Sequence, residues 1–129
     1  IQQGTAEKRI GKVVFGTVAG DIHDIAKDIV VFMLDINGFE VTDLGVDVSV
    51  EKFVEAVKTT GAKIVGLSGF LTLAYDPMKA TTAAVKAIDP EVKAMVGGGQ
   101  IDEQIREHTG ADAYGKDAMA AVAIAKGWA

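Results

Sequence analysis

Short apolar runs alternate along the chain with longer stretches in which apolar residues recur every three or four positions. A short run bounded by turn residues is typical of a buried strand, and the longer spacing is typical of a helix with one face against a sheet. Five such pairs occur. The predicted strands are 13–18, 39–44, 64–68, 92–96 and 111–114, and the predicted helices are 22–36, 50–60, 77–88, 100–109 and 117–126.

Several residues mark the ends and inner faces of these helices. Ser49 is a suitable N-cap, and Gly38 and Gly61 are typical of helix ends. Pro77 is suited to the start of the third helix. The first helix is expected to bury Ile22, Ile25, Ala26, Ile29, Val30, Met33 and Ile36, and the third to bury Met78, Thr81, Val85 and Ile88.

Five strand–helix units predict an α/β fold, a flavodoxin-like (Rossmann-like) doubly wound parallel sheet with strand order 2-1-3-4-5. Residues 1–129 are expected to form a single domain. Strands 1 and 3 are neighbours in this order and their following loops diverge, which is where ligands of such sheets bind. Functional chemistry is therefore expected in the loops after Val18, Ser68 and Val96.

Composition excludes several classes of partner. The chain has 129 residues, 49% of them hydrophobic, and 13 basic against 18 acidic side chains give a net charge of −5. Such a chain lacks the basic field that nucleic-acid binding needs, and it has no apolar run of about 18 residues that could span a membrane. The absence of cysteine fits a reducing compartment, so a cytoplasmic location is expected. Because the chain begins at Ile1 rather than Met, we interpret it as a piece of a longer protein.

The loop after the first strand holds a candidate site. Asp21 precedes His23 by two positions, so its carboxylate could hold the imidazole in one tautomer while the other ring nitrogen faces a metal or a proton. Ser68 ends the neighbouring strand and could reach Asp21. The topology therefore predicts a Ser-Asp-His relay, and the alternative is that Asp21 caps the helix and His23 is an ordinary first-turn residue.

Common enzyme motifs do not fit these residues. Ser68 lacks the glycine two positions after it that a hydrolase elbow requires, because residue 70 is Phe, and it stands where a phospho-acceptor receiver domain carries aspartate. A zinc site needs three or four ligands, whereas the chain has two histidines, of which His108 lies far along the sequence. Neither a Gly-x-Gly-x-x-Gly motif nor a Walker A lysine follows the first strand.

The stretch GTVAGDIHDIAK at 16–27 resembles the Asp-x-His-x-x-Gly signature of cobalamin-binding domains, in the form used by corrinoid proteins of methyltransferase systems. The similarity covers about residues 10–126. It includes the segments NGFEV at 37–41, DLGVDV at 43–48, GLS at 66–68, LT at 71–72, VGG at 96–98 and GADAY at 110–114.

The resemblance implies cobalamin as cofactor, with His23 as the lower axial ligand of cobalt in place of the cofactor's dimethylbenzimidazole. Asp21 and Ser68 would modulate the protonation of His23. The displaced nucleotide tail would lie in a slot lined by the end of the third strand and the Gly97-Gly98 turn. The further cofactor-binding residues that it implies are Ile22, Asp24, Ile25, Ala26, Phe70, Leu71, Thr72 and Tyr114. Because the corrin ring supplies four nitrogen ligands to cobalt, a single protein histidine is enough for the lower axial position.

The function that the resemblance implies is that of a carrier subunit rather than a complete enzyme. Such a domain carries a methyl group on cobalt between a donor-specific methyltransferase and an acceptor methyltransferase, and a reductive activator is a further expected partner. Related carriers have an N-terminal helical domain, for which residues 1–129 hold no counterpart. The alternatives are the cobalamin domain of a carbon-skeleton mutase, a cobalamin-dependent sensor or regulatory module, and a degenerate domain that binds no corrinoid.

Two positions depart from the family pattern. The glycine of the signature is Ala26 here, and the usual Ser-x-Leu is Ser68-Gly69-Phe70. Both changes enlarge side chains beside the expected tail slot and so affect its shape. Ligation of cobalt depends instead on Asp21, His23 and Ser68, all of which are present.

Overall fold

The computed structural model describes residues 11–18, 25–69, 75–97, 103–115 and 118–128. Five parallel strands form one sheet with the order β2-β1-β3-β4-β5, which confirms the predicted topology. The strands are β1 (Gly11–Thr17), β2 (Phe39–Asp43), β3 (Ile64–Ser68), β4 (Lys93–Gly97) and β5 (Ala113–Gly115). The helices are α1 (Ile25–Ile36), α2 (Val50–Thr60), α3 (Tyr75–Ile88), α4 (Glu103–Thr109) and α5 (Ala118–Trp128).

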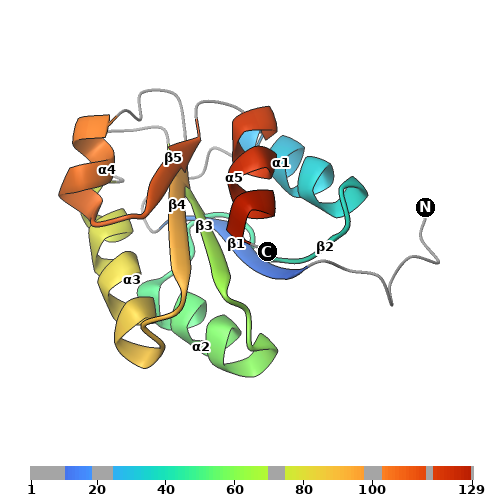
Figure 1. Ribbon diagram of the computed structural model, residues 1–129. Helices are drawn as coiled ribbons and strands as arrows, with labels where there is room; N and C mark the ends of the chain where they lie inside the picture. Colours follow the sequence, from blue (N-terminus) through green and yellow to red (C-terminus); the bar gives the residue numbers. More distant parts are fainter. Residues whose placement is uncertain (1–10, 19–24, 70–74, 98–102, 116–117, 129) are drawn as a thin grey trace.

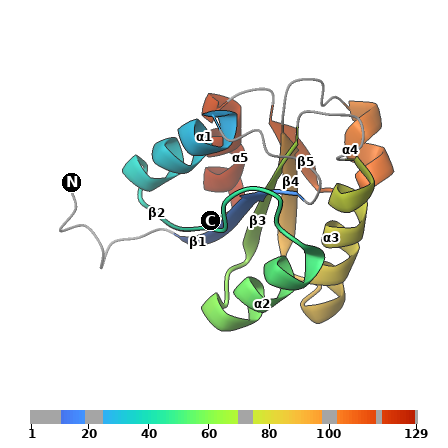
Figure 2. The ribbon, with the colours of Figure 1, turned by 180° about the vertical axis from the view of Figure 1, so that it is seen from behind.

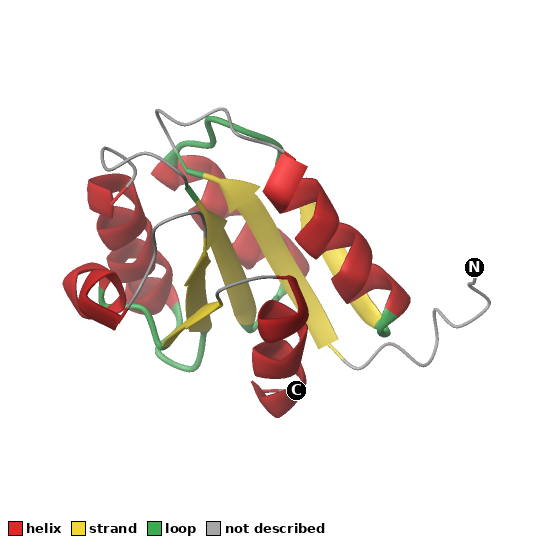
Figure 3. Cartoon of the chain, turned by 90° about the horizontal axis from the view of Figure 1, so that it is seen from above, coloured by secondary structure: helices red, strands yellow, loops and turns green. Residues whose placement is uncertain are grey.

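The helices cover both faces of the sheet. One face is covered by α1 and α5, which contact each other, and the other face by α2, α3 and α4 (Figures 1 and 2). Seen from above, the sheet lies between these two helical layers (Figure 3). Among the described residues, no helix has the length and hydrophobicity that crossing a bilayer requires.

The ends of α2 are set by the residues expected from the sequence. The hydroxyl of Ser49 accepts a hydrogen bond of 3.2 Å from the backbone N–H of Lys52, so Ser49 is the N-cap. Gly61 adopts a left-handed conformation with φ 72°, and its N–H donates to the Val57 carbonyl at 2.9 Å. In contrast, α3 begins at Tyr75, before Pro77, and Ile88 is 38% exposed rather than buried.

Each face of the sheet has its own hydrophobic core cluster. On the α2–α4 face, Val14, Val65 and Val96 pack with Phe53 and Met78. On the α1/α5 face, the cluster contains Val13, Phe15, Leu34, Phe39, Ile64, Met95, Ala121, Val122 and Ala125. Successive residues of a strand point to opposite faces, so these two clusters identify the face on which each strand residue lies.

The inward face of α1 differs from the prediction. Leu34 is fully buried, whereas Ile29 and Ile36, which were expected to be buried, are 51% and 59% exposed. Phe32 is 61% exposed as well. The apolar residues of this helix are spread around most of its circumference, so their spacing along the sequence does not identify the side that contacts the sheet. The prediction for Ile29 and Ile36 was therefore wrong.

A surface ion pair joins the turn before β3 to the end of α3. The Lys63 ammonium donates a hydrogen bond to Asp89, and together with the Glu91 N–H this lowers the pKa of the Asp89 carboxyl. A depressed folded-state pKa stabilises the fold above the ordinary aspartate pKa, and this stabilisation is lost as the pH falls through the lowered value. We expect Asp89→Asn to flatten slightly the acid side of a plot of melting temperature against pH. The effect is small because Lys63 is exposed and Asp89 is partly exposed to solvent.

The control for this prediction is Glu91→Gln. Its carboxylate lies 3.9 Å from Lys63 Nζ and is 82% exposed, so the substitution should change the acid side less than Asp89→Asn does. Equal flattening by both variants would contradict the assignment of this pH dependence to Asp89.

Candidate functional site

A row of small residues crosses the carboxyl edge of the sheet. The register pairs Thr17 with Ser68, Ser68 with Gly97, and Gly97 with Gly115. We call these four residues the edge row. They are the last paired residues of β1, β3, β4 and β5, so the row marks the level at which these strands end.

The edge row lies on the α1/α5 face of the sheet. Phe15 and Met95 belong to the core cluster of that face, and Thr17 and Gly97 follow them by two positions on the same strands. Gly115 is directed the same way, because a Cβ added to it would lie 3.3 Å from the backbone nitrogen of Ala121 in α5. The four positions therefore face the layer formed by α1 and α5.

Gly97 brings no side chain to the edge row. A Cβ added at Gly97 would meet, among described atoms, only the backbone oxygen of Gly115 at 3.3 Å. Thr17 and Ser68 bring buried side chains that are 0% and 7% exposed. We call the strip of backbone at Gly97, between Ser68 and Gly115, the cradle. Ser68 borders it on one side, and Gly115, which lies against the backbone of α5, borders it on the other.

Backbone hydrogen bonds hold the cradle rigid. The N–H of Val18 donates to the Ser68 carbonyl at 3.0 Å, and the N–H of Gly69 donates to the Gly97 carbonyl at 3.0 Å. The N–H of Thr17 donates to the Gly45 carbonyl at 2.9 Å. None of the four edge-row side chains is ionisable, so any charge here must come from a ligand or from the loops that follow the strands.

The structure brings some of the predicted site residues together. Ser68 and Gly97 are register partners in the cradle. Tyr114 lies on neighbouring β5 but packs against the core cluster of the opposite face. Ile25 and Ala26 lie in the first turn of α1. The other predicted residues are outside the described part of the chain: Asp21, Ile22, His23, Asp24, Phe70, Leu71, Thr72 and Gly98.

Two residues of the edge row were missed by the sequence reasoning. Thr17 comes just before Val18, at which the first strand was expected to end. It lies two positions after Phe15, so the two side chains point to the same face of the sheet, and this spacing could have identified it. Gly115 was missed because the last strand was expected to end at Tyr114, whereas β5 includes Gly115. A shift of one position changes the face to which a strand residue points.

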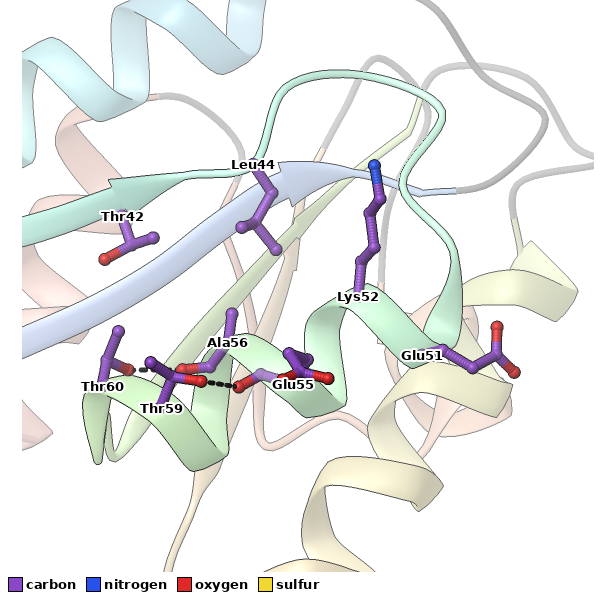
Figure 4. A pocket seen from close by; sticks show the side chains of 8 residues that line it. All are labelled: Thr42, Leu44, Glu51, Lys52, Glu55, Ala56, Thr59 and Thr60. Atoms are coloured by element: carbon purple, nitrogen blue, oxygen red, sulfur yellow. Dashed lines mark hydrogen bonds between the residues drawn. The ribbon is translucent and has the colours of Figure 1, made fainter.

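A hollow of about 420 Å³ lies away from the cradle, between β2 and α2 (Figure 4). Its lining residues are Thr42, Leu44, Glu51, Lys52, Glu55, Ala56, Thr59 and Thr60. The hydroxyls of Thr59 and Thr60 donate to backbone carbonyls one turn earlier in α2, at 2.8 and 2.7 Å. These two hydroxyls are therefore engaged within the helix, and the hollow contains no residue expected to be functional.

Comparison with known proteins connects this geometry to a family. Residues 11–123 match the family model described as B12 binding domain. The chain is 41% identical over 125 residues to dimethylamine corrinoid protein 2 of Methanosarcina mazei, an alignment that covers 95% of this chain. It covers 58% of that relative, so the chain spans little more than half of the relative's length.

Two solved structures show the same arrangement of strands and helices. A cobalamin-binding protein from Desulfitobacterium hafniense is 44% identical, with a TM-score of 0.90, and the match covers 95% of this chain and 60% of that one. The methanol:cobalamin methyltransferase complex MtaBC from Methanosarcina barkeri contains a chain that is 29% identical, with a TM-score of 0.85. That match covers 91% of this chain and 45% of the other.

Proposed function

Because the chain belongs to the B12-binding domain family, we propose that it holds cobalamin with His23 on cobalt and carries a methyl group between two methyltransferases. Cobalamin is the cofactor that this membership indicates. The corrinoid proteins among the relatives, and the methyltransferase complex among the similar structures, favour a methyl carrier over a mutase domain or a sensor.

The cradle is the observation that carries this proposal. The nucleotide tail of cobalamin is long and narrow, and a protein that displaces it from cobalt must hold it beside the sheet. Gly97 lies at the edge where the family resemblance implies the tail slot, and the hydroxyl-bearing residue Ser68 is its neighbour on β3. The residues present therefore fit the tail.

The connection of β1 supports the proposed position of His23. Val18, whose N–H is bonded to the Ser68 carbonyl, is followed within a few residues by Asp21 and His23. A histidine that binds a metal through one ring nitrogen commonly donates its other N–H to a carboxylate, which orients the ring and raises its basicity. In the proposed site Asp21 accepts this hydrogen bond, and Ser68 is the neighbour that can stabilise Asp21.

The chemistry of methyl transfer comes from the cofactor, whose cobalt accepts the methyl group from one substrate and releases it to another. The contribution of this chain is binding and control of a proton. Asp21 and Ser68 can retain a proton when His23 leaves the metal and release it when His23 returns. We propose a donor-specific methyltransferase, an acceptor methyltransferase and a reductive activator as partners.

The first test is the identity of the axial ligand. Protein labelled with ¹⁵N-histidine is loaded with cobalamin, reduced to the Co(II) form and examined by electron paramagnetic resonance. We expect a doublet splitting from ¹⁵N, because His23 binds cobalt, where unlabelled protein gives a triplet from ¹⁴N. In His23→Ala the ¹⁵N splitting should disappear while the fold is retained.

The chain provides a matched control, because its only other histidine is His108. His108 lies in α4 with its Nε2 3.4 Å from Asp76, and His108→Ala should leave the splitting unchanged. A triplet from labelled wild-type protein would mean that the cofactor's own base remains on cobalt. That result would refute the proposed ligation.

A further inference from the structure

We propose that the outer face of α1 is the seat of a helix from the remainder of a longer polypeptide that carries this domain. The face is formed by Ile29, Phe32 and Ile36, which we call the α1 stripe. None of these three residues was expected to bind the cofactor. The inference therefore goes beyond the proposed function and does not depend on cobalamin.

The α1 stripe is a patch rather than three scattered residues. Five large apolar side chains are exposed among the described residues, and three of them belong to the stripe. Residues three or four positions apart are neighbours on one face of a helix, so Phe32 links Ile29 to Ile36. Single exposed apolar residues are common on protein surfaces, whereas a contiguous apolar patch marks a surface of contact.

The domain does not use the α1 stripe for its own core. Leu34 is the fully buried residue of α1, and it packs in the cluster between this helix, α5 and the sheet. It lies two positions from both Phe32 and Ile36, and at 3.6 residues per turn this spacing places it on the opposite side of the helix. The stripe is therefore left for a second contact.

Additional chain would begin beside the α1 stripe. The match covers 58% of the Methanosarcina mazei relative and 60% of the Desulfitobacterium hafniense chain, so about two-fifths of each lies outside it. At one end, β1 begins at Gly11, whose register partner Phe39 follows Ile36 by three positions. At the other end, α5 contacts α1, and Trp128 packs against the same core cluster as Leu34. A segment attached at either end starts close to α1, which gives it a high effective concentration at the stripe.

The spacing and charge of α1 indicate the form of the occupant. An amphipathic helix can cover a stripe of this spacing with its own apolar face. Asp28 and Asp35 are exposed and seven positions apart, so both lie along one side of the stripe. The covering helix is therefore expected to carry Lys or Arg along that edge.

The test compares residues 1–129 with the longer protein that the natural gene encodes. Because these residues include no cysteine, Ile36→Cys supplies their one reactive thiol. In residues 1–129 a maleimide should modify it as it modifies an exposed cysteine. In the longer protein we expect modification to be at least about tenfold slower, because the covering helix excludes the reagent. Mass spectrometry of the peptide that carries residue 36 measures both rates, at a concentration where sedimentation shows single copies.

Two further variants make the test specific. Phe32→Lys removes the central anchor of the stripe, and lysine is a good helix former at this exposed position. Combined with Ile36→Cys in the longer protein, it should return the rate to within about threefold of that in residues 1–129. The matched control is Ile88→Cys, because Ile88 is an exposed apolar residue at the end of α3, on the other face of the sheet. Its rate should be the same in both proteins.

The other outcomes overturn the proposal. Equal modification of Ile36→Cys in the two proteins would show that the added chain does not cover α1, and a natural gene that encodes no further helix would leave no occupant. Slow modification already in residues 1–129, with a dimeric mass that Phe32→Lys abolishes, would mean that a second copy covers the stripe. All rates are measured without cobalamin, so failure here leaves the proposed function intact.

Discussion

Replacing Gly97 by leucine is expected to weaken cobalamin binding by roughly 10- to 100-fold and to leave cobinamide binding nearly unchanged. A leucine side chain here would cover the cradle, and its Cβ alone would lie 3.3 Å from the Gly115 oxygen. Overpacking of a well-formed site typically costs about 1 to 3 kcal/mol, and each 1.4 kcal/mol is a factor of ten in affinity. Titration of both corrinoids, followed by absorption, measures the two changes.

Gly127→Leu is the matched control for this experiment. Gly127 lies near the end of α5, and a Cβ added there would meet no described atom within 4 Å. The same chemical change should therefore leave both affinities unaltered. If Gly97→Leu weakens both corrinoids equally, the cradle does not hold the tail and has another role.

The second large effect is expected for Asp21→Asn. This substitution keeps the shape of the side chain and removes the charge that, in the proposed site, raises the basicity of His23. Changes of this kind commonly cost about 10- to 100-fold in metal affinity or activity. We expect a comparable loss of cobalamin affinity, and a change in the pH at which the spectrum shows loss of histidine from cobalt.

Ser68→Ala tests the outer end of the same relay. Ser68 is buried at the carboxyl end of β3, and in the proposed relay its uncharged hydroxyl supports Asp21. The loss of affinity should therefore be smaller than for Asp21→Asn. The relay is wrong if both variants match wild-type protein in affinity and in the pH dependence of the spectrum.

The order of the strands could be predicted because it follows from local patterns and general rules. Each buried strand is a short apolar run, the helices between them are amphipathic, and right-handed crossovers restrict the remaining arrangements. The bounds of β3 agree with the prediction at both ends. The predicted caps of α2 are confirmed as well, because Ser49 and Gly61 make their capping hydrogen bonds with residues of the same helix.

The details of the site could not be predicted to the same extent. Whether Tyr114 or Gly115 faces the cradle depends on one position in a strand of three residues, and the composition of that segment does not fix its ends. The pairing of Thr17 with Ser68 depends on the register of two strands that are distant in the sequence. The loop that holds Asp21 and His23 lies outside the described residues, so their roles stay predictions.

The contact between α1 and α5 has a consequence for the order in which the domain assembles. These two helices are the first and the last ones described, and they share one face of the sheet (Figure 1). Contacts between distant parts of a chain form late, because the intervening loop must first be closed. Until α5 docks, Gly115 has no helix against it and the core around Leu34 is incomplete. We therefore expect the cofactor to load onto the finished domain rather than onto the nascent chain.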